Sequence, residues 1–416
     1  MPSHAHPFHN ATIPVKPFRL SHTQQQVDDM KTLIRLSPLG PATYENDPAR
    51  DEKMGISMQS MREIKEAWLE YDWLARQEDL NALPQYIAQV VDTDSKTGKE
   101  HTFDVHFVGK MSEIEEAIPL ILLHGWPGMG LFELTPMIEA LKTAGAPPLH
   151  LIIMDFPGYL YSSPPPLDAD FSLEGMMRVA HGLMMGLGFK EYAAQGGDLG
   201  AFVSRLLACR YKECKAIHVN MVPLRADLPA FKDIQLNDRD RARMKRFHEF
   251  NNTGSGYAIE HATRPSTIGF ALAASPLALA AWVGEKLHEW TDETPPMSVV
   301  LQWLTLYWLT QTFPTSIYAY RHTMFEQKDP TTRPGESAKD FTKPMTGTYV
   351  DKPMGYSLFE YELLPTPISW AEKTGNLVSS AEHQHGGHFA ATEHPDLLAQ
   401  DVVEFLKVAW PARKRD

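Results

Sequence analysis

Cysteine is scarce in this 416-residue chain, which contains only Cys209 and Cys214. The two residues are five positions apart in a segment that we interpret as one helix, where side chains at that spacing point in different directions. A disulfide between them is therefore not expected, as is typical of proteins from a reducing, intracellular compartment. Cysteine and histidine do not follow a metal-site spacing either, so we expect no bound metal.

Basic residues are outnumbered by acidic ones. The chain has 39 Lys and Arg against 52 Asp and Glu, which gives a formal net charge of −13 at pH 7. A nucleic-acid surface needs clustered Lys and Arg to displace the counterions of the phosphates. The short basic tail of Arg413, Lys414 and Arg415 is interpreted as a solvated end, and no nucleic-acid partner is expected.

Long hydrophobic runs are also missing. The longest, Ile268 to Gly284, is interrupted by Ser275 and Pro276 and is shorter than the roughly 20 residues that span a bilayer. We interpret it as a buried helix pair near a pocket. The N-terminus is polar and lacks the apolar core of a signal peptide. These features predict a cytoplasmic protein without a membrane anchor.

Short apolar runs alternate with helix-like segments from Ile118 onward. Three of these runs, at 119–123, 149–154 and 192–195, end in loops rich in Gly or Pro. Such runs indicate a mostly parallel sheet covered by helices on both faces, which is an α/β fold. Sites in such sheets form beyond the carboxyl ends of the strands.

The pattern divides the chain into four segments. Residues 1–110 form an N-terminal extension, in which we expect a helix from Ser60 to Leu80 and a strand over Thr102–Val108. The other segments are the first part of the α/β core at 111–225, a wholly helical and aromatic-rich cap at 226–330, and the second part of the core at 331–416. The last segment contains predicted strands at 354–359 and 376–380 and a helix at 395–409.

Gly196-Gly197-Asp198-Leu199-Gly200 has the small-x-nucleophile-x-small form of a nucleophile elbow. Gly on both sides tolerates the sharp turn because it has no Cβ. On this position alone, Asp198 could equally be the N-cap of the following helix. A carboxylate displaces well at sp³ carbon but is a poor acyl nucleophile. Asp198 as nucleophile therefore favours epoxide opening or halide displacement over ester hydrolysis.

His388 lies after the last predicted strand, where an α/β-hydrolase carries its histidine, in the order nucleophile, acid, histidine. We interpret the nearby His383 and His385 as surface loop residues. The acid should follow the strand at 354–359, so Glu362 is our choice and Glu360 the alternative, ahead of Asp351, which precedes that strand. Such a carboxylate holds the imidazole tautomer and stabilises the imidazolium.

Three motifs together resemble the microsomal-type epoxide hydrolases, in their soluble fungal branch. They are His124-Gly125-Trp126-Pro127-Gly128, the elbow around Asp198, and the segment 386–391. The N-terminal segment 68–73 is also similar to that family, so the resemblance covers most of the chain. It implies an α/β-hydrolase fold with an inserted cap, and hydrolysis of epoxides to vicinal diols.

The resemblance also implies residue roles and partners. The backbone N–H groups of Trp126 and Leu199 would form the oxyanion hole, and Tyr257 and Tyr320 of the cap would donate to the epoxide oxygen. No metal or organic cofactor is implied, the substrate is a small apolar epoxide in a detoxification role, and a homodimer is plausible by analogy. One departure is Glu360, which stands where relatives tend to have Pro.

Two other functions stay open on the sequence. A haloalkane dehalogenase uses the same Asp and His chemistry but needs indole or amide donors for the halide, whereas this chain has the paired tyrosines Tyr257 and Tyr320. A catalytically silent α/β-hydrolase that binds a small apolar ligand is the second alternative, disfavoured by the intact Asp198 and His388. An ordinary esterase would need Ser at position 198.

Overall fold

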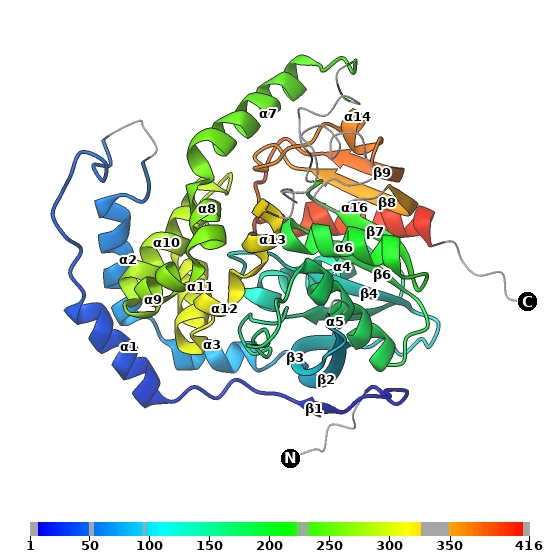
Figure 1. The fold of residues 1–416 in the computed structure, drawn as a ribbon, viewed down its shortest axis with the longest axis horizontal. Coiled ribbons are helices and arrows are strands. Elements are labelled where there is room, and N and C mark those ends of the chain that lie inside the picture. The colour runs from blue at the N-terminus through cyan, green and yellow to red at the C-terminus, as the bar shows by residue number, and fades with distance from the viewer. Residues whose placement is uncertain are drawn as a thin grey trace, which may run out of the picture.

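The computed structural model describes residues 7–49, 54–94, 97–222, 224, 231, 233–325 and 349–410. The basic tail at 413–415 lies outside these residues. One half of the molecule is a sheet with flanking helices, and the other half is a group of helices (Figure 1). The boundaries of the four segments predicted above stay a prediction.

The described residues form a nine-stranded sheet in the order β1-β2-β3-β5-β4-β6-β7-β8-β9. Neighbouring strands from β5 to β9 run parallel, while β1, β2, β3 and β5 pair antiparallel, so the predicted mostly parallel sheet is confirmed. The strands are β1 (Val15–Pro17), β2 (Gln85–Thr93), β3 (Glu100–Lys110), β4 (Ile118–Leu123), β5 (Leu149–Met154), β6 (Tyr192–Gly196), β7 (Cys214–Val219), β8 (Val350–Leu358) and β9 (Gly375–Glu382).

Helices cover both sides of the central strands. One pair, α5 (Leu173–Gly186) and α6 (Asp198–Arg210), packs together, as does a second pair, α4 (Pro136–Thr143) and α16 (Pro395–Ala409). Residues 120–123 of β4 are buried almost completely. This burial on both faces explains why the strand is a continuous apolar run rather than an alternating one.

The N-terminal segment reaches both halves of the molecule. β1 pairs with β2 at the sheet edge. In the helical half, α1 (Gln24–Leu36) and α2 (Met58–Glu70) contact α10 (Pro276–Glu289) and α11 (Met297–Thr310). The single helix expected over 60–80 is wrong, because a separate helix, α3 (Trp73–Leu80), follows α2. Asp72 ends the continuity: its side chain accepts the N–H of Ala75 and caps α3.

The helical half comes from the segment between β7 and β8. Its helices are α7 (Asp238–Glu249), the π-turn η3 (Phe250–Gly254), α8 (Gly256–Thr263), α9 (Pro265–Ala273), α10 (Pro276–Glu289), α11 (Met297–Thr310), α12 (Phe313–Ser316) and α13 (Ala319–Phe325). Three short elements complete the described chain: η1 (Gly130–Glu133), α14 (Ile368–Ala371) and α15 (Ala390–Glu393). The insertion places helices beside the carboxyl ends of the parallel strands (Figure 1).

The apolar run at 268–284 forms a helix pair, as predicted, but the predicted burial is confirmed for α10 only, since α9 buries just Gly269 and Leu272. The chain bends by 117° between α9 and α10, at the break that contains Ser275. α10 is largely buried, whereas Phe270 on α9 is 78% exposed. Among the described residues no single helix has the length and apolarity to cross a membrane, although this bent pair meets those criteria jointly.

The two cysteines do not share a helix, contrary to the expectation. Cys209 lies in α6 and Cys214 opens β7. The helix ends between them because the chain becomes extended at Tyr211, whose N–H closes the last turn on Leu207. Both thiols are free.

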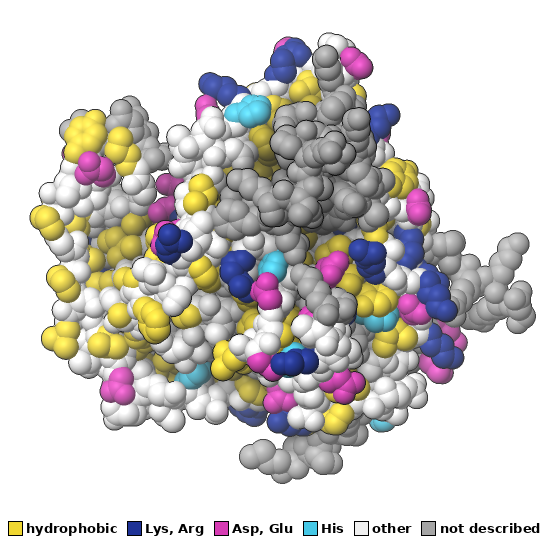
Figure 2. Space-filling model, in the orientation of Figure 1, with side chains coloured by type: hydrophobic (Ala, Val, Ile, Leu, Met, Phe, Trp, Pro, Cys, Tyr) yellow, Lys and Arg dark blue, Asp and Glu magenta, His cyan; other side chains and the backbone are white. Residues whose placement is uncertain are grey.

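Side chains on the visible face differ between the two halves. Figure 2 shows Lys, Arg, Asp and Glu interspersed over the sheet half, and hydrophobic side chains scattered over the helices of the other half. Leu36 on α1 and Phe270 on α9 are among the most exposed large apolar residues.

Candidate active site

Asp198 lies on a sharp turn between β6 and α6. Its φ of +46° is in the left-handed region, which costs a residue with a Cβ about 1–3 kcal/mol. The N-cap of α6 is Gly197, and Asp198 is the first helical residue, so the capping interpretation is wrong. A Cβ at Gly200 would lie 2.1 Å from the carbonyl oxygen of Leu123, so glycine allows α6 to cross close to β4.

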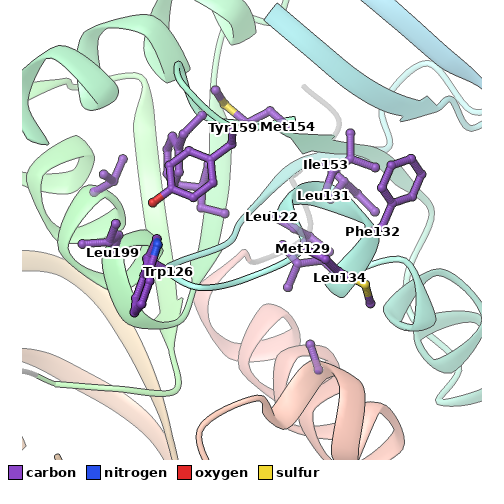
Figure 3. Close-up of a cluster of buried hydrophobic side chains, with 14 of the residues drawn as sticks. Leu122, Trp126, Met129, Leu131, Phe132, Leu134, Ile153, Met154, Tyr159 and Leu199 are labelled. Carbon is purple, nitrogen blue, oxygen red and sulfur yellow. The ribbon is translucent and has the colours of Figure 1, made fainter. Parts of the chain in front are cut away.

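The carboxylate of Asp198 faces the loop after β4. Its Oδ1 accepts a hydrogen bond from the backbone N–H of Trp126, with a distance of 2.8 Å. The segment from Trp126 to Leu134 contributes side chains to a buried apolar cluster that also includes Leu199 (Figure 3). Leu199 lies in the first turn of α6, where backbone N–H groups have no acceptor within the helix. Both predicted oxyanion donors therefore lie beside Asp198.

His388 joins Asp198 to the acid. Its Nδ1 is 2.8 Å from Oε1 of Glu362, and its Nε2 is 3.4 Å from Oδ2 of Asp198. Burial by itself lowers the pKa of His388, but the charges and hydrogen bonds of Glu362 and Asp198 outweigh it and raise that pKa well above its ordinary value. The imidazole is thus an imidazolium held between two carboxylates.

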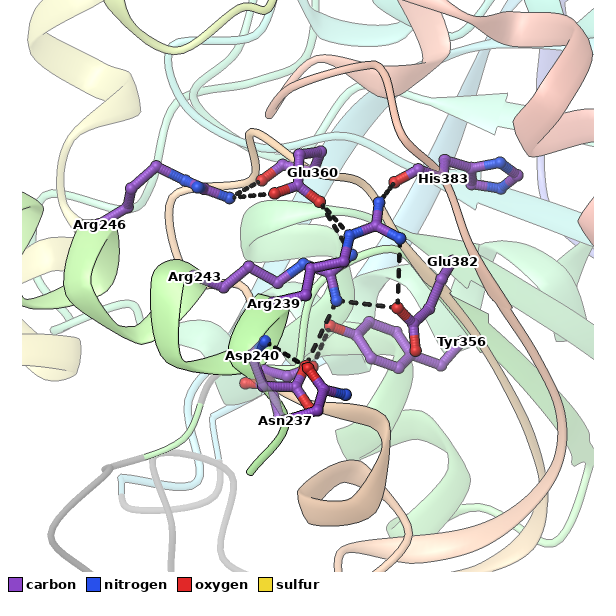
Figure 4. A network of polar contacts seen from close by, with 10 residues as sticks. Asn237, Arg239, Asp240, Arg243, Arg246, Tyr356, Glu360, Glu382 and His383 are labelled. Carbon is purple, nitrogen blue, oxygen red and sulfur yellow. Dashed lines mark hydrogen bonds and ion pairs between the residues drawn. The ribbon is translucent and has the colours of Figure 1, made fainter. Parts of the chain in front are cut away.

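Glu362, and not Glu360, lies beside His388. Glu362 is 2% exposed, and its Oε1 also accepts the N–H of Leu363. Glu360 instead faces three arginines of α7, with N···O distances of 2.8–3.0 Å to Arg239, Arg243 and Arg246 (Figure 4). Burial raises the pKa of Glu360, but hydrogen bonds from Arg246 and Arg239 bring it below its ordinary value.

Two smaller expectations near the acid and the histidine are wrong. Asp351 lies within β8 rather than before it. His383 is not a plain surface residue: its Nε2 is 2.6 Å from Asp401 Oδ2, and its ring stacks on Phe359. The neighbouring His385 is exposed, as expected. His383 is partly buried because β9 extends to Glu382 and carries it against α16.

The two predicted cap tyrosines lie together over the nucleophile loop. Tyr257 of α8 and Tyr320 of α13 have ring centroids 5.6 Å apart, and both rings contact the indole of Trp126. Burial raises the pKa of both phenols above the ordinary value of 10, and the charge of Asp198 adds to this effect. Both phenols therefore stay protonated and can donate hydrogen bonds at neutral pH.

One further carboxyl group at this site, that of Glu133, was not predicted from the sequence. Glu133 of η1 lines the same small cavity as Asp198 and His388. A usable signal was present, since Glu133 is a lone acidic residue between Phe132 and Leu134 in an apolar segment. Within the described part of the chain, no three His, Cys, Asp or Glu side chains are grouped so that they could hold a metal ion.

A parallel sheet, a helical insertion before β8, and an aspartate elbow facing a histidine–carboxylate pair define the α/β-hydrolase class. Residues 118–290 match the α/β-hydrolase fold family model, and residues 15–131 match the model described as epoxide hydrolase N terminus. The resemblance to epoxide hydrolases inferred from the motifs is thereby confirmed.

Relatives of known structure or name agree with these matches. The Aspergillus niger epoxide hydrolase structure is 38% identical, with 96% of this chain and 98% of that chain covered and a TM-score of 0.83. A Dothistroma septosporum protein named as an epoxide hydrolase is 36% identical over 96% of this chain and 91% of its own. Epoxide hydrolase 1 of Sus scrofa is 27% identical over 94% and 88% of the two chains. This chain belongs to the epoxide hydrolase family.

Proposed function

We propose that this enzyme converts epoxides to vicinal diols through a covalent ester on Asp198. The observation that carries the proposal is a carboxylate, not a hydroxyl, at the elbow, facing His388 on one side and the loop under Tyr257 and Tyr320 on the other. A carboxylate nucleophile is suited to displacement at sp³ carbon. Two phenol donors are suited to an oxygen leaving group that stays on the substrate.

In the first step Asp198 attacks one epoxide carbon, and that carbon–oxygen bond breaks. Tyr257 and Tyr320 donate to the ring oxygen as it gains charge, and the oxygen ends as a hydroxyl. The oxygen takes this proton from one of the two phenols, and the phenolate regains a proton from solvent. Once Asp198 is esterified, its charge no longer stabilises the imidazolium of His388, which releases its proton to solvent. The products are a hydroxyalkyl ester of Asp198 and a neutral His388.

In the second step water attacks the carbonyl carbon of the ester. His388, held by Glu362 through Nδ1, takes a proton from this water at Nε2. The backbone N–H groups of Trp126 and Leu199 stabilise the oxyanion, since fixed donors are needed where the charge develops. The ester bond breaks, the diol leaves, and Asp198 and His388 return to their charged states.

The substrate that we propose is a small apolar epoxide. Aromatic rings surround the nucleophile loop: Trp126 contacts Tyr257, Trp290, Phe313 and Tyr320. Such a lining favours apolar or aryl groups on the substrate. In this proposal the helices of segment 226–330 act as the cap that supplies the lining, and segment 1–110 supports that cap.

The reaction is tested by two product assays and one variant. With aryl and alkyl epoxides the wild type is expected to form diols, and with haloalkanes it is expected to release no halide. In His388→Gln the ester should form but persist, which adds the mass of the epoxide to the intact protein. Asp198→Ala is the matched control and should show neither turnover nor adduct. Halide release would point to a dehalogenase, and rapid turnover by either variant would contradict the scheme.

Three further statements stay proposals. They are a detoxification role, a cytoplasmic location and a homodimer, and each was expected from the sequence or from the resemblance. A homodimer is tested by light scattering of the purified chain, and the location by fractionation of the cells that produce it.

A further inference from the structure

A cavity of water size lies beside the nucleophile. Its volume open to the centre of a water molecule is about 10 Å³, which is close to the minimum that holds one water. The residues that border it include Trp126, Glu133, Asp198, Asn220, His388 and Phe389. A bound water needs two to four polar partners, and this cavity has titratable groups from three separate loops around it.

Glu133 reaches this cavity from the turn η1. The residue is only 8% exposed, although it is acidic and its chain neighbours are apolar. A Cβ at Gly128 would lie 2.1 Å from Oε2 of Glu133, so the glycine makes room for the carboxyl group. The backbone of Glu133 is fixed from the other side, since its carbonyl oxygen accepts a hydrogen bond from Thr392.

The carboxyl group of Glu133 has an unpartnered oxygen atom. Oε2 of Glu133 is buried and makes no hydrogen bond to the described residues. Nε2 of His388 lies 3.4 Å from Oδ2 of Asp198, its ion-pair partner. A buried polar group without a partner costs about 1–3 kcal/mol, so such groups persist mainly where they serve a ligand, a water or a reaction. A purely structural glutamate would be expected to have a protein partner.

The carboxyl group of Glu133 also has an unusual pKa. Burial raises its pKa to about 8, the positive charge of His388 lowers it, and the charge of Asp198 raises it. Glu133 is therefore mostly a neutral carboxylic acid at neutral pH. A neutral acid beside Asp198 does not repel the nucleophile, and it can both accept and donate a hydrogen bond.

We propose that Glu133 holds the hydrolytic water against the Asp198 ester, on the side of the water that His388 does not occupy. This inference rests on the proposed function. The water donates one hydrogen to Nε2 of His388 and the other to a carboxyl oxygen of Glu133, which leaves a lone pair for the ester carbon. Two fixed acceptors orient the attack in the way that positioned groups generally lower a barrier.

The step balances in atoms and charge. The water oxygen bonds to the carbonyl carbon of the ester, and the bond from that carbon to the substrate oxygen breaks. One water proton ends on the diol and the other on His388, which regains its positive charge as Asp198 regains its negative charge. Glu133 keeps its own proton throughout and acts only through hydrogen bonds.

The test separates the two steps in Glu133→Ala and Glu133→Gln by rapid quenching and intact mass. In Glu133→Ala, ester formation should stay within about twofold of wild type, while ester hydrolysis slows about tenfold or more, as for a lost hydrogen bond in a buried site. The ester should then accumulate during turnover. Glu133→Gln keeps a carbonyl acceptor and nearly the same shape, so it should lose less. Glu139→Gln, at an exposed carboxylate on the next helix, is the control and should behave as wild type.

Three outcomes overturn the role of Glu133. One is equal slowing of both steps in Glu133→Gln, another is unchanged ester hydrolysis in Glu133→Ala, and the third is equal hydrolysis rates in the two variants. Thermal melting of Glu133→Gln verifies that the comparison is made on folded protein. Failure of the proposed function itself looks different, because His388→Gln would then form no ester.

Discussion

In the proposed mechanism, the position of His388 between two carboxylates sets the order of the chemical steps. While Asp198 is ionised, its charge and that of Glu362 keep the imidazole protonated, and an imidazolium cannot act as a base. When Asp198 becomes a neutral ester, as we propose, one of these charges is gone and the imidazole can accept the proton of water. The same residue thus changes role because its neighbour changes charge.

This arrangement predicts a pH-dependent stability. The folded pKa of His388 is raised above its ordinary value of 6.5, so the stabilisation is fully present below pH 6.5 and is lost as pH rises through the folded value. The difference in Tm between wild type and His388→Gln should therefore decrease steadily as pH rises through the alkaline range. Paired thermal melts from pH 6 upward measure this difference, and a difference that grows with pH would contradict the assigned charge state.

Neighbouring residues also show what the sequence could not decide. Glu360 and Glu362 are two positions apart after the same strand, and the motif order fits both. Only the tertiary structure distinguishes their roles. Glu360 forms ion pairs with the arginines of α7, whereas Glu362 pairs with His388. Glu133 was not predicted because it lies outside the motifs, although it is a lone acidic residue in an apolar segment.

Ion pairs connect helix α7 to the loop after β8, which carries Glu362. Arg239, Arg243 and Arg246 converge on Glu360, and Arg243 also pairs with Glu382 at the end of β9 (Figure 4). Arg243 is fully buried, so it depends on these carboxylates for its solvation. The cluster thus links α7 of the helical insertion to Glu360 and to the end of β9. Glu360 lies two residues before Glu362 in the chain.

Removing the charge of Glu360 should therefore weaken the fold. Glu360→Gln is expected to lower the free energy of unfolding by about 3 kcal/mol, since it leaves a buried arginine short of a partner. Because the folded pKa of Glu360 is lowered, this difference is present above the unfolded pKa and shrinks as pH falls through the folded value. Denaturant unfolding at neutral and acid pH measures it. Glu404→Gln, in an exposed pair with Lys407, is the control. An equal loss of unfolding free energy in both variants would show that the arginine cluster does not stabilise the fold.

At the scale of elements, periodic and continuous apolar patterns predicted the fold well. The run at 149–154 and the helix at 395–409 have the predicted bounds. The errors lie where a local polar group decides the outcome. Asp72 caps a new helix inside an apparently continuous pattern, and the chain turns from α6 to β7 between the cysteines. Helical periodicity alone does not show where one helix ends and the next element begins.

At the scale of the whole molecule, the site joins loops that are far apart in the sequence. Trp126 follows β4, Asp198 follows β6, Glu362 follows β8 and His388 follows β9. Because these strands are parallel, their carboxyl ends share one edge of the sheet, and the helical insertion meets that edge. The motifs predicted this assembly, since each lies at the end of an apolar run.

One labelling experiment tests the covalent role of Asp198 most directly. The purified enzyme is mixed in excess over an epoxide in water enriched in ¹⁸O, so that each active site turns over at most once. The account predicts that the label enters the carboxylate of Asp198, as found by mass spectrometry of the peptide around Gly197, and that the first diol carries none. Label in the first diol, with an unlabelled Asp198, would contradict it.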